Sequence, residues 1–195
     1  MSASEQARLA AGQVVSRELT VNLPSGRFIG GVSYAIIDAP ADVVMRVILD
    51  VDAYREILPL ALEAREVGRR DADRFVYFRH GNRIGTASYI CQVRPVSGTL
   101  VRFWMDRSRP HDFEDAWGYF RVDPLGPGRS LLTYAGLIDL GFGFVRFFFE
   151  EKVRHYLLST PELVQTYVRK QNEREAEDAS AAAPSEPATR GNVRP

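Results

Sequence analysis

The order of its sequence patterns is the strongest constraint on this chain: many extended segments come first, and one amphipathic helical segment follows. After Pro59, apolar and polar residues alternate in six runs separated by turn-prone residues, as in antiparallel strands. These runs are 61–69, 73–80, 84–94, 99–107, 112–122 and 130–140. From Phe144 to Asn172, apolar residues recur at spacings of three and four, which predicts a helix with one apolar face. Thr160-Pro161-Glu162 is a helix-start signal, so we expect a break there.

The segment before Pro59 predicts a hairpin and two short helices. Extended patterns at 12–21 and 28–37 flank a stretch rich in turn residues. Pro40 then stands at the start of a helix, where its missing N–H costs nothing, and valines and an isoleucine follow at helical spacing. A second helix is expected at about 53–58, ending at Pro59.

This order predicts an α+β fold in which a curved antiparallel sheet wraps around a long C-terminal helix. One helix cannot fill the whole concave face of such a sheet, so an apolar cavity is expected between them. The 195 residues suit one domain, at 12–172, preceded by an extension at 1–11. Residues 173–195 lack aromatic residues and apolar periodicity and are expected to form a disordered tail.

Charge and cysteine content exclude several function classes. Lysine plus arginine and aspartate plus glutamate number 25 each, so no net field attracts nucleic acid. The single Cys91 excludes an internal disulfide, and no apolar window is long enough to span a membrane, so we expect a cytoplasmic protein. Neither a zinc-binding histidine spacing nor a glycine-rich nucleotide motif occurs, and we expect no metal or cofactor.

Two segments resemble a known family. GGVSYAIIDAPADVVMRVILDVDAYREILPLALEAREVG contains Ala39-Pro40, Val43-Val44 and a run from Asp50 to Pro59 that resemble the opening of START-like (SRPBCC) proteins of the polyketide-cyclase/dehydrase and ubiquinone-binding type. Met45 stands where that family commonly has an aromatic residue. DAWGYFRVDPLGPGRSLLTYAGLIDLG resembles the family's penultimate hairpin, so the resemblance spans about 28–165. It implies the helix-grip fold.

The resemblance leaves three functions open, because the family includes carriers, cyclases and interaction modules. The leading hypothesis is a non-enzymatic protein that encloses a lipid, isoprenoid, quinone or polyketide. The alternatives are a polyketide cyclase or dehydratase using acid, tyrosine or arginine groups of the cavity, and an interaction module with a filled cavity. A titratable pair facing the cavity would favour the enzyme, and a purely apolar lining would favour the carrier.

Candidate site residues come from three patterns. Alternation back from Pro124 places Glu114 and Phe120 on the cavity face, where the carboxylate would need Arg79, Arg102 or Arg154 as a partner, unless the register differs by one. Too many phenylalanines follow Gly141 for one helix face to bury, so some face a cavity, a membrane surface or a partner. The cavity candidates are Glu114, Phe120, Tyr134, Phe142, Phe144, Phe148, Arg154 and Tyr156.

Two loops complete the expectations. Gly141 and Gly143 flank a segment that is either a mobile loop at the pocket mouth, as in the family, or a plain turn. The segment 107–115 combines acids, arginines and His111, which suits either an acid–base pair or a polar hairpin end.

Overall fold

The described residues of the computed structural model form eight strands and five helices. It describes residues 1–58, 60–83, 85–141 and 144–182, without the side chains of 144–148 and 182. The strands are β1 (Val15–Leu23), β2 (Gly26–Ile37), β3 (Ala61–Arg70), β4 (Asp73–Gly81), β5 (Thr86–Ser97), β6 (Leu100–Met105), β7 (Asp115–Gly126) and β8 (Arg129–Asp139). The helices are α1 (Ala3–Ala10), α2 (Ala41–Leu49), α3 (Tyr54–Ile57), α4 (Phe144–Leu158) and α5 (Thr160–Ala182).

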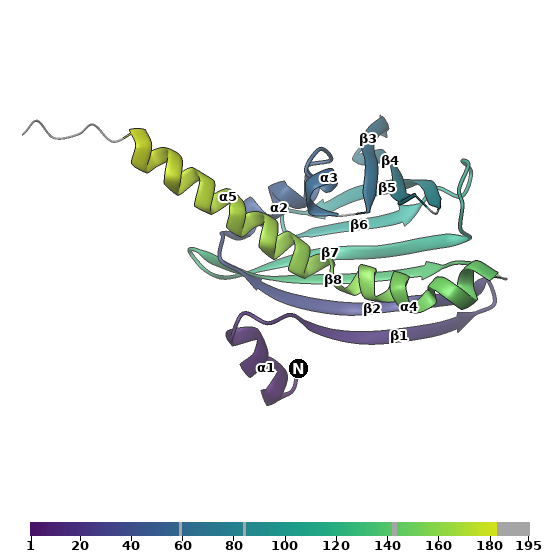
Figure 1. Ribbon diagram of the computed structural model, residues 1–195, viewed down its shortest axis with the longest axis horizontal. Helices are drawn as coiled ribbons and strands as arrows, with labels where there is room; N and C mark the ends of the chain where they lie inside the picture. Colours follow the sequence, from purple (N-terminus) through teal and green to yellow (C-terminus); the bar gives the residue numbers. More distant parts are fainter. Residues whose placement is uncertain (59, 84, 142–143, 183–195) are drawn as a thin grey trace, which may run out of the picture.

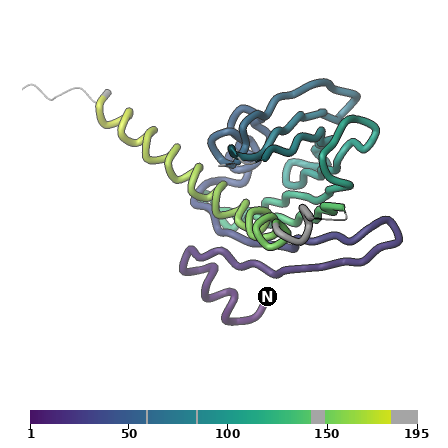
Figure 2. Tube along the Cα trace, turned by 45° about the vertical axis from the view of Figure 1, so that its right-hand side comes forward, coloured from purple at the N-terminus to yellow at the C-terminus, as the bar shows by residue number. Residues whose placement is uncertain are grey.

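The strands form one antiparallel sheet in the order β1-β2-β8-β7-β6-β5-β4-β3. The last six strands therefore form the predicted meander, and the N-terminal hairpin joins it through the pairing of β2 with β8. The sheet curves strongly, so that β1–β2 and β3–β5 lie on opposite sides of the C-terminal helices (Figure 1 and Figure 2). This arrangement confirms the helix-grip fold.

The main core lies between the concave face of the sheet and helices α2 and α5. Ile37 of β2 and Leu132 of β8 pack there against Val44 of α2 and Val164 of α5. Leu132 and Val44 are fully buried. Burial of this kind is the main stabilising term of a fold this size, because each large apolar side chain removed from water contributes roughly 2 kcal/mol. Helices α2 and α5 are thereby fixed on the sheet.

The expected helix break is confirmed: α4 ends at Leu158 and α5 begins at Thr160, directly before Pro161. Pro161 is buried and needs no backbone donor in this first turn. The end of α5 differs from the expectation, because the helix continues past Asn172 to Ala182 (Figure 1). Alanine and glutamate dominate this stretch, and their intrinsic helix propensity needs no apolar face. The rest of the expected tail, 183–195, lies outside the described residues.

The N-terminal extension contains a helix that the sequence pattern did not predict. α1 begins with a capping box: the Glu5 backbone N–H donates to the Ser2 hydroxyl, and the Ser2 backbone N–H donates to the Glu5 carboxylate. Leu9 is buried, and Arg17 of β1 forms an ion pair with Glu5 at 2.7 Å. These contacts place α1 on β1, on the opposite side from α4 (Figure 1).

Candidate functional site

The concave face of the sheet is not completely filled. Val93 of β5 and Phe103 of β6 are register partners near the centre of the sheet, and both pack against the main core. Both nevertheless remain partly exposed. In a closely packed interior such central side chains would be fully buried. Their exposure shows that the C-terminal helices leave part of the concave face uncovered, and we refer to the room above these two side chains as the interior space.

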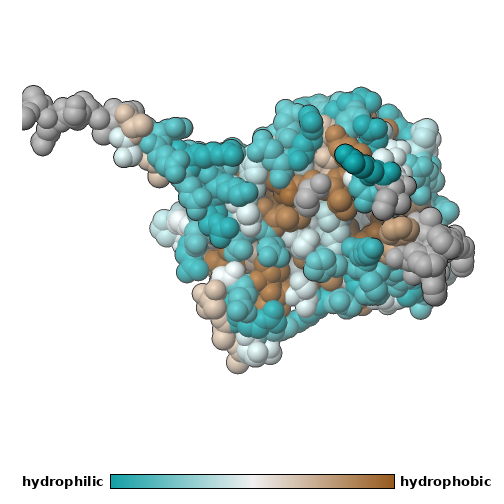
Figure 3. All heavy atoms as spheres, in the orientation of Figure 1, coloured by the Kyte–Doolittle hydropathy of each residue, from teal (hydrophilic) through white to brown (hydrophobic). Residues whose placement is uncertain are grey.

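The surface above this space is apolar. Figure 3 shows hydrophobic side chains gathered in a depression between the C-terminal helices and the region of α3 and β3. Leu60 and Leu62, at the start of β3, are among the exposed large apolar residues, with exposed fractions of 38% and 42%. An apolar depression that leads towards partly exposed core residues is the usual form of a binding site for hydrophobic molecules.

Three polar aromatic side chains meet where β4 and β5 approach α4; we call them the His80 cluster. The Tyr89 hydroxyl lies 3.0 Å from His80 Nε2, and the Tyr156 hydroxyl lies 3.5 Å from His80 Nδ1. The rings of His80 and Tyr89 stack at an interplanar angle of 10°, while Tyr156 meets His80 edge-on. Both ring nitrogens of His80 therefore have a tyrosine partner.

Burial keeps the His80 cluster neutral. It lowers the pKa of His80 to about 4, because the imidazolium would lose its hydration inside the protein. Burial also raises the pKa of Tyr89 and of Tyr156, and it raises the pKa of the nearby Cys91 thiol to about 12. At pH 7 these groups are a neutral imidazole, two phenols and a thiol, which can donate or accept hydrogen bonds without carrying charge.

Two of the predicted cavity residues, Phe120 and Tyr134, belong to the core of the concave face. Their ring centroids lie 4.9 Å apart, and Phe103 stacks on Tyr134 at 6.1 Å. A hydrogen bond with Thr160 satisfies the Tyr134 hydroxyl at the junction of α4 and α5. Phe120 and Tyr134 are 7% and 4% exposed, so they form the floor beside Phe103.

Glu114 is exposed, which corrects the expectation of a carboxylate in an apolar cavity. β7 begins one residue later, at Asp115, so the alternation that places Phe120 inside does not extend to Glu114. Its backbone N–H donates to the Asp139 carbonyl at 3.0 Å, and its side chain lies beside Gly141. A Cβ at Gly141 would approach Glu114 Cγ to 3.1 Å, and its φ of 76° also favours glycine.

Arg154 is buried, but it does not pair with Glu114. Its guanidinium lies 3.1 Å from Glu150 and 3.7 Å from Glu18, and it donates a hydrogen bond to Thr20 at 3.2 Å. Arg27 of β2 holds the same Glu150 through two hydrogen bonds of 2.5 and 2.8 Å. This network ties α4 to β1 and β2, so the described role of Arg154 is to anchor the helix.

The structure describes the remaining predicted residues unequally. Tyr156 lies in the His80 cluster, as given above. Phe144 and Phe148 belong to α4, but their side chains and the whole of Phe142 lie outside the described residues. The sequence analysis missed Tyr89, because alternation within β5 does not show which residues of the neighbouring strand lie beside its ring. The pairing of Phe78 with Tyr89 across β4 and β5 brings it beside His80.

The polar segment 107–115 is a surface turn. The Asp112 carboxylate accepts hydrogen bonds from Ser88 N and Oγ at 2.7 and 2.8 Å, and Arg109 pairs with Asp106 at 3.1 Å. Asp112 is thus held by Ser88, and Asp115 lies 3.8 Å from Arg107 of the same segment. Phe113 alone points inwards, 4.7 Å from the Tyr89 ring centroid.

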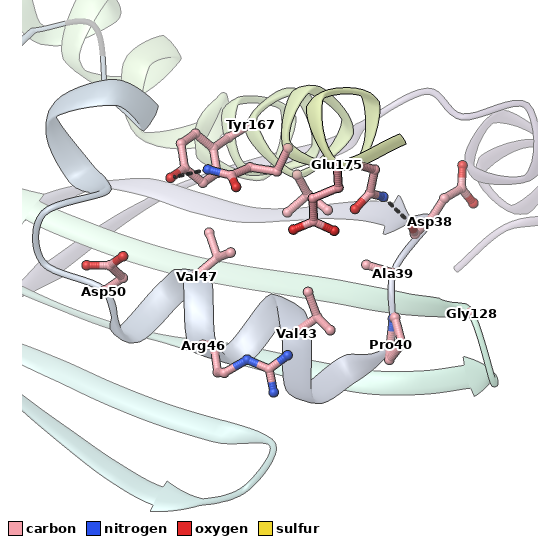
Figure 4. Close-up of a pocket in the computed structure, with 13 residues that line it drawn as sticks. Asp38, Ala39, Pro40, Val43, Arg46, Val47, Asp50, Gly128, Tyr167 and Glu175 are labelled. Carbon is pink, nitrogen blue, oxygen red and sulfur yellow. Dashed lines mark hydrogen bonds between the residues drawn. The ribbon is translucent and has the colours of Figure 1, made fainter. Parts of the chain in front are cut away.

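A hollow of about 520 Å³ lies between α2 and the middle of α5 (Figure 4). Val43 and Val47 of α2 face Tyr167 of α5 there, and charged side chains stand at the rim. The charged members of its lining are Asp38, Arg46, Asp50 and Glu175. This volume is large enough for a small molecule, but its charged rim suits an apolar ligand less well than the interior space does.

The described residues contain no group of histidine, cysteine and acidic side chains arranged to hold a metal ion. Among the described helices, none is long and apolar enough to cross a membrane.

The fold is START-like, and comparisons with solved structures agree. The STAR-related lipid transfer protein from Xanthomonas axonopodis matches with a TM-score of 0.63 and 15% identity, over 79% of this chain and 98% of that one. Zhui aromatase/cyclase from Streptomyces matches with a TM-score of 0.58 and 15% identity, over 86% of this chain and 98% of that one. Human STARD10 matches with a TM-score of 0.65 and 11% identity, over 86% of this chain and 74% of that one. Identities this low establish the fold alone.

Residues 31–162 match the family described as polyketide cyclase/dehydrase and lipid transport. The match covers more than half of the chain, so the protein belongs to this family and the predicted resemblance is confirmed. No curated protein matches the chain. The family description joins enzymes with carriers, and the choice between them depends on this chain's own site.

Proposed function

We propose that this protein binds and carries a hydrophobic small molecule, of the lipid, isoprenoid, quinone or polyketide type, between the sheet and the C-terminal helices. The observation that carries the proposal is the partial exposure of Val93 and Phe103 beneath the helices. The apolar depression in Figure 3 and the membership of a family that includes lipid transport support it.

Apolar contact alone provides sufficient affinity. At ~25 cal/mol per Å², burial of roughly 300 Å² of ligand surface contributes about 7.5 kcal/mol, which corresponds to micromolar affinity. Phe103, Phe120 and Tyr134 present a rigid aromatic floor for such contact. Rigid side chains lose little conformational entropy when a ligand binds.

The His80 cluster favours a second candidate, a cyclase or dehydratase acting on a polyketide-like substrate. The neutral imidazole of His80 can accept a hydrogen bond from a substrate hydroxyl, and a phenol can donate a hydrogen bond to a carbonyl. Turnover of a poly-β-ketone substrate that is lost in His80→Leu would establish this function. Binding without turnover would leave the carrier as the better description.

Filling the interior space tests the proposal directly. Val93→Trp should weaken binding of a neutral fluorescent lipid probe by about tenfold or more, because the indole occupies the space above Phe103. Val96→Trp is the matched control, since Val96 lies in the same strand with 49% of its surface exposed. Equal binding by both variants and the wild type would place the ligand elsewhere. No binding by the wild type would favour a filled, non-ligand module.

We also propose that the protein works in the cytoplasm, because its single cysteine is buried and forms no disulfide. Fractionation of the native host, with the protein followed by immunodetection, tests this location; recovery in an extracytoplasmic fraction would contradict it.

A further inference from the structure

The chemistry of the His80 cluster narrows the ligand class. This argument rests on the proposed function, because it assumes that a ligand enters the space beside α4. Three polar hydrogens belong to the cluster: one on each hydroxyl of Tyr89 and Tyr156, and one on the neutral imidazole of His80. Two hydrogen bonds join these groups and use two of the three hydrogens.

One hydrogen is therefore left over, whichever ring nitrogen of His80 carries its proton. If Nδ1 is protonated it donates to Tyr156, Tyr89 donates to Nε2, and the Tyr156 O–H stays available. If Nε2 is protonated, the order reverses and the Tyr89 O–H stays available. The hydrogen bond with the Leu60 backbone acts to lower the Tyr156 pKa, so the Tyr156 oxygen accepts it and no hydrogen is used.

An unused donor in a mostly buried site has a free-energy cost until it finds an acceptor. Tyr89 and Tyr156 are partly exposed, so a ligand acceptor can reach them. A ligand oxygen satisfies this requirement, and a carbonyl oxygen offers two lone pairs without bringing a hydrogen of its own.

The described side chains provide no unpaired buried cation for a charged ligand group at this position. Among the side chains that the structure describes, each arginine or lysine that is not exposed is paired with a carboxylate. These residues are Arg27, Arg74, Arg109 and Arg154, paired with Glu150, Glu66, Asp106 and Glu150 respectively. A ligand carboxylate or phosphate beside His80 would be buried without a counter-charge, which is costly.

We propose that the ligand is a neutral hydrophobic molecule bearing a carbonyl group, and that the His80 cluster donates one hydrogen bond to that carbonyl. The tyrosine hydroxyls and the imidazole fix the orientation of the ligand, while the apolar walls hold its body. Fatty acids and phospholipids are excluded from this position by their charge.

The test uses the full chain and three probes of one chain length: an alkane, its methyl ketone and its carboxylate, each displacing a neutral fluorescent lipid. The wild type should bind the ketone about 2–10-fold more tightly than the alkane, the value of one net hydrogen bond. The carboxylate should bind more weakly than the ketone. The carbonyl stretching band of the bound, ¹³C-labelled ketone should move to lower wavenumber than in a hydrocarbon solvent.

The variant His80→Leu/Tyr89→Phe/Tyr156→Phe removes all three donors and should abolish both the ketone preference and the band shift. Because it replaces every partner of the cluster with apolar groups, it should still fold. Tyr77→Phe is the control, since Tyr77 lies on the opposite face of β4, against Arg65.

Equal affinity for ketone and alkane, or tighter binding of the carboxylate, would overturn this inference and leave the carrier function intact. A ketone preference that persists in the triple variant would also overturn it. Failure of the wild type to bind any of the three probes would overturn the carrier function together with the inference.

Discussion

The pH dependence of stability should identify His80 as a buried neutral group. The folded protein holds the His80 pKa at about 4, against 6.5 for the exposed side chain. A folded pKa below the unfolded one means that the unfolded chain binds more protons between these values. The stabilisation is complete above about pH 6.5 and is lost as the pH falls towards 4.

The magnitude follows from these two pKa values. When His80 is protonated in both the folded and the unfolded state, the unfolding free energy is lower than at neutral pH by about 3 kcal/mol, at roughly 1.4 kcal/mol per pKa unit. Between pH 7 and pH 5 the loss is about 2 kcal/mol. This interval lies above the titration of carboxylates such as Glu66, whose pKa two arginines lower to about 2 and whose contribution is lost only under more acidic conditions.

Urea unfolding at pH 7 and pH 5 measures the effect. In His80→Leu the difference in unfolding free energy between the two pH values should be smaller than in the wild type by about 2 kcal/mol, whatever the absolute stability of the variant. His155→Gln serves as the control, because His155 is exposed on α4. If His80→Leu retains the full wild-type pH dependence, the burial of a neutral imidazole is refuted.

The remaining predictions concern the anchoring of α4 and the core. Arg154→Met should destabilise the protein by about 1–3 kcal/mol, because Glu150 loses its buried partner and keeps only the partly buried Arg27. Arg46→Met, at an exposed pair, should change little, and unfolding titrations compare the two variants. Leu132→Ala should cost about 2–5 kcal/mol through loss of packing beneath α2 and α5, and Leu125→Ala, which is 53% exposed, should leave the melting temperature nearly unchanged. An Arg154→Met protein as stable as the wild type would show that the network does not hold α4.

The sheet, the helix order and the break before Thr160 could be predicted because each rests on a local signal. Period-two alternation marked the strands, and a hydroxyl followed by proline and an acid marked the start of α5. The order of the elements predicted that the sheet wraps around the helix, and the family resemblance implied the same fold. The helical stretch beyond Asn172 was missed because it forms without an apolar face.

The site could be predicted only in part, because its residues meet through pairings across strands. Phe120 and Tyr134 followed from alternation within their own strands. The prediction that Glu114 faces the cavity was wrong because β7 begins after this residue. Tyr89 was missed because its contact with His80 depends on the register of β4 against β5. Shifts of one residue in that register would place either ring on the other face of the sheet.

Native mass spectrometry of the freshly purified protein, followed by organic extraction, tests the central claim most directly. The account predicts a defined adduct of one hydrophobic molecule per chain, absent or much reduced in Val93→Trp and retained in Val96→Trp. A protein that leaves the cell empty, and that takes up neither neutral lipids nor quinones nor ketones when they are added, would contradict it.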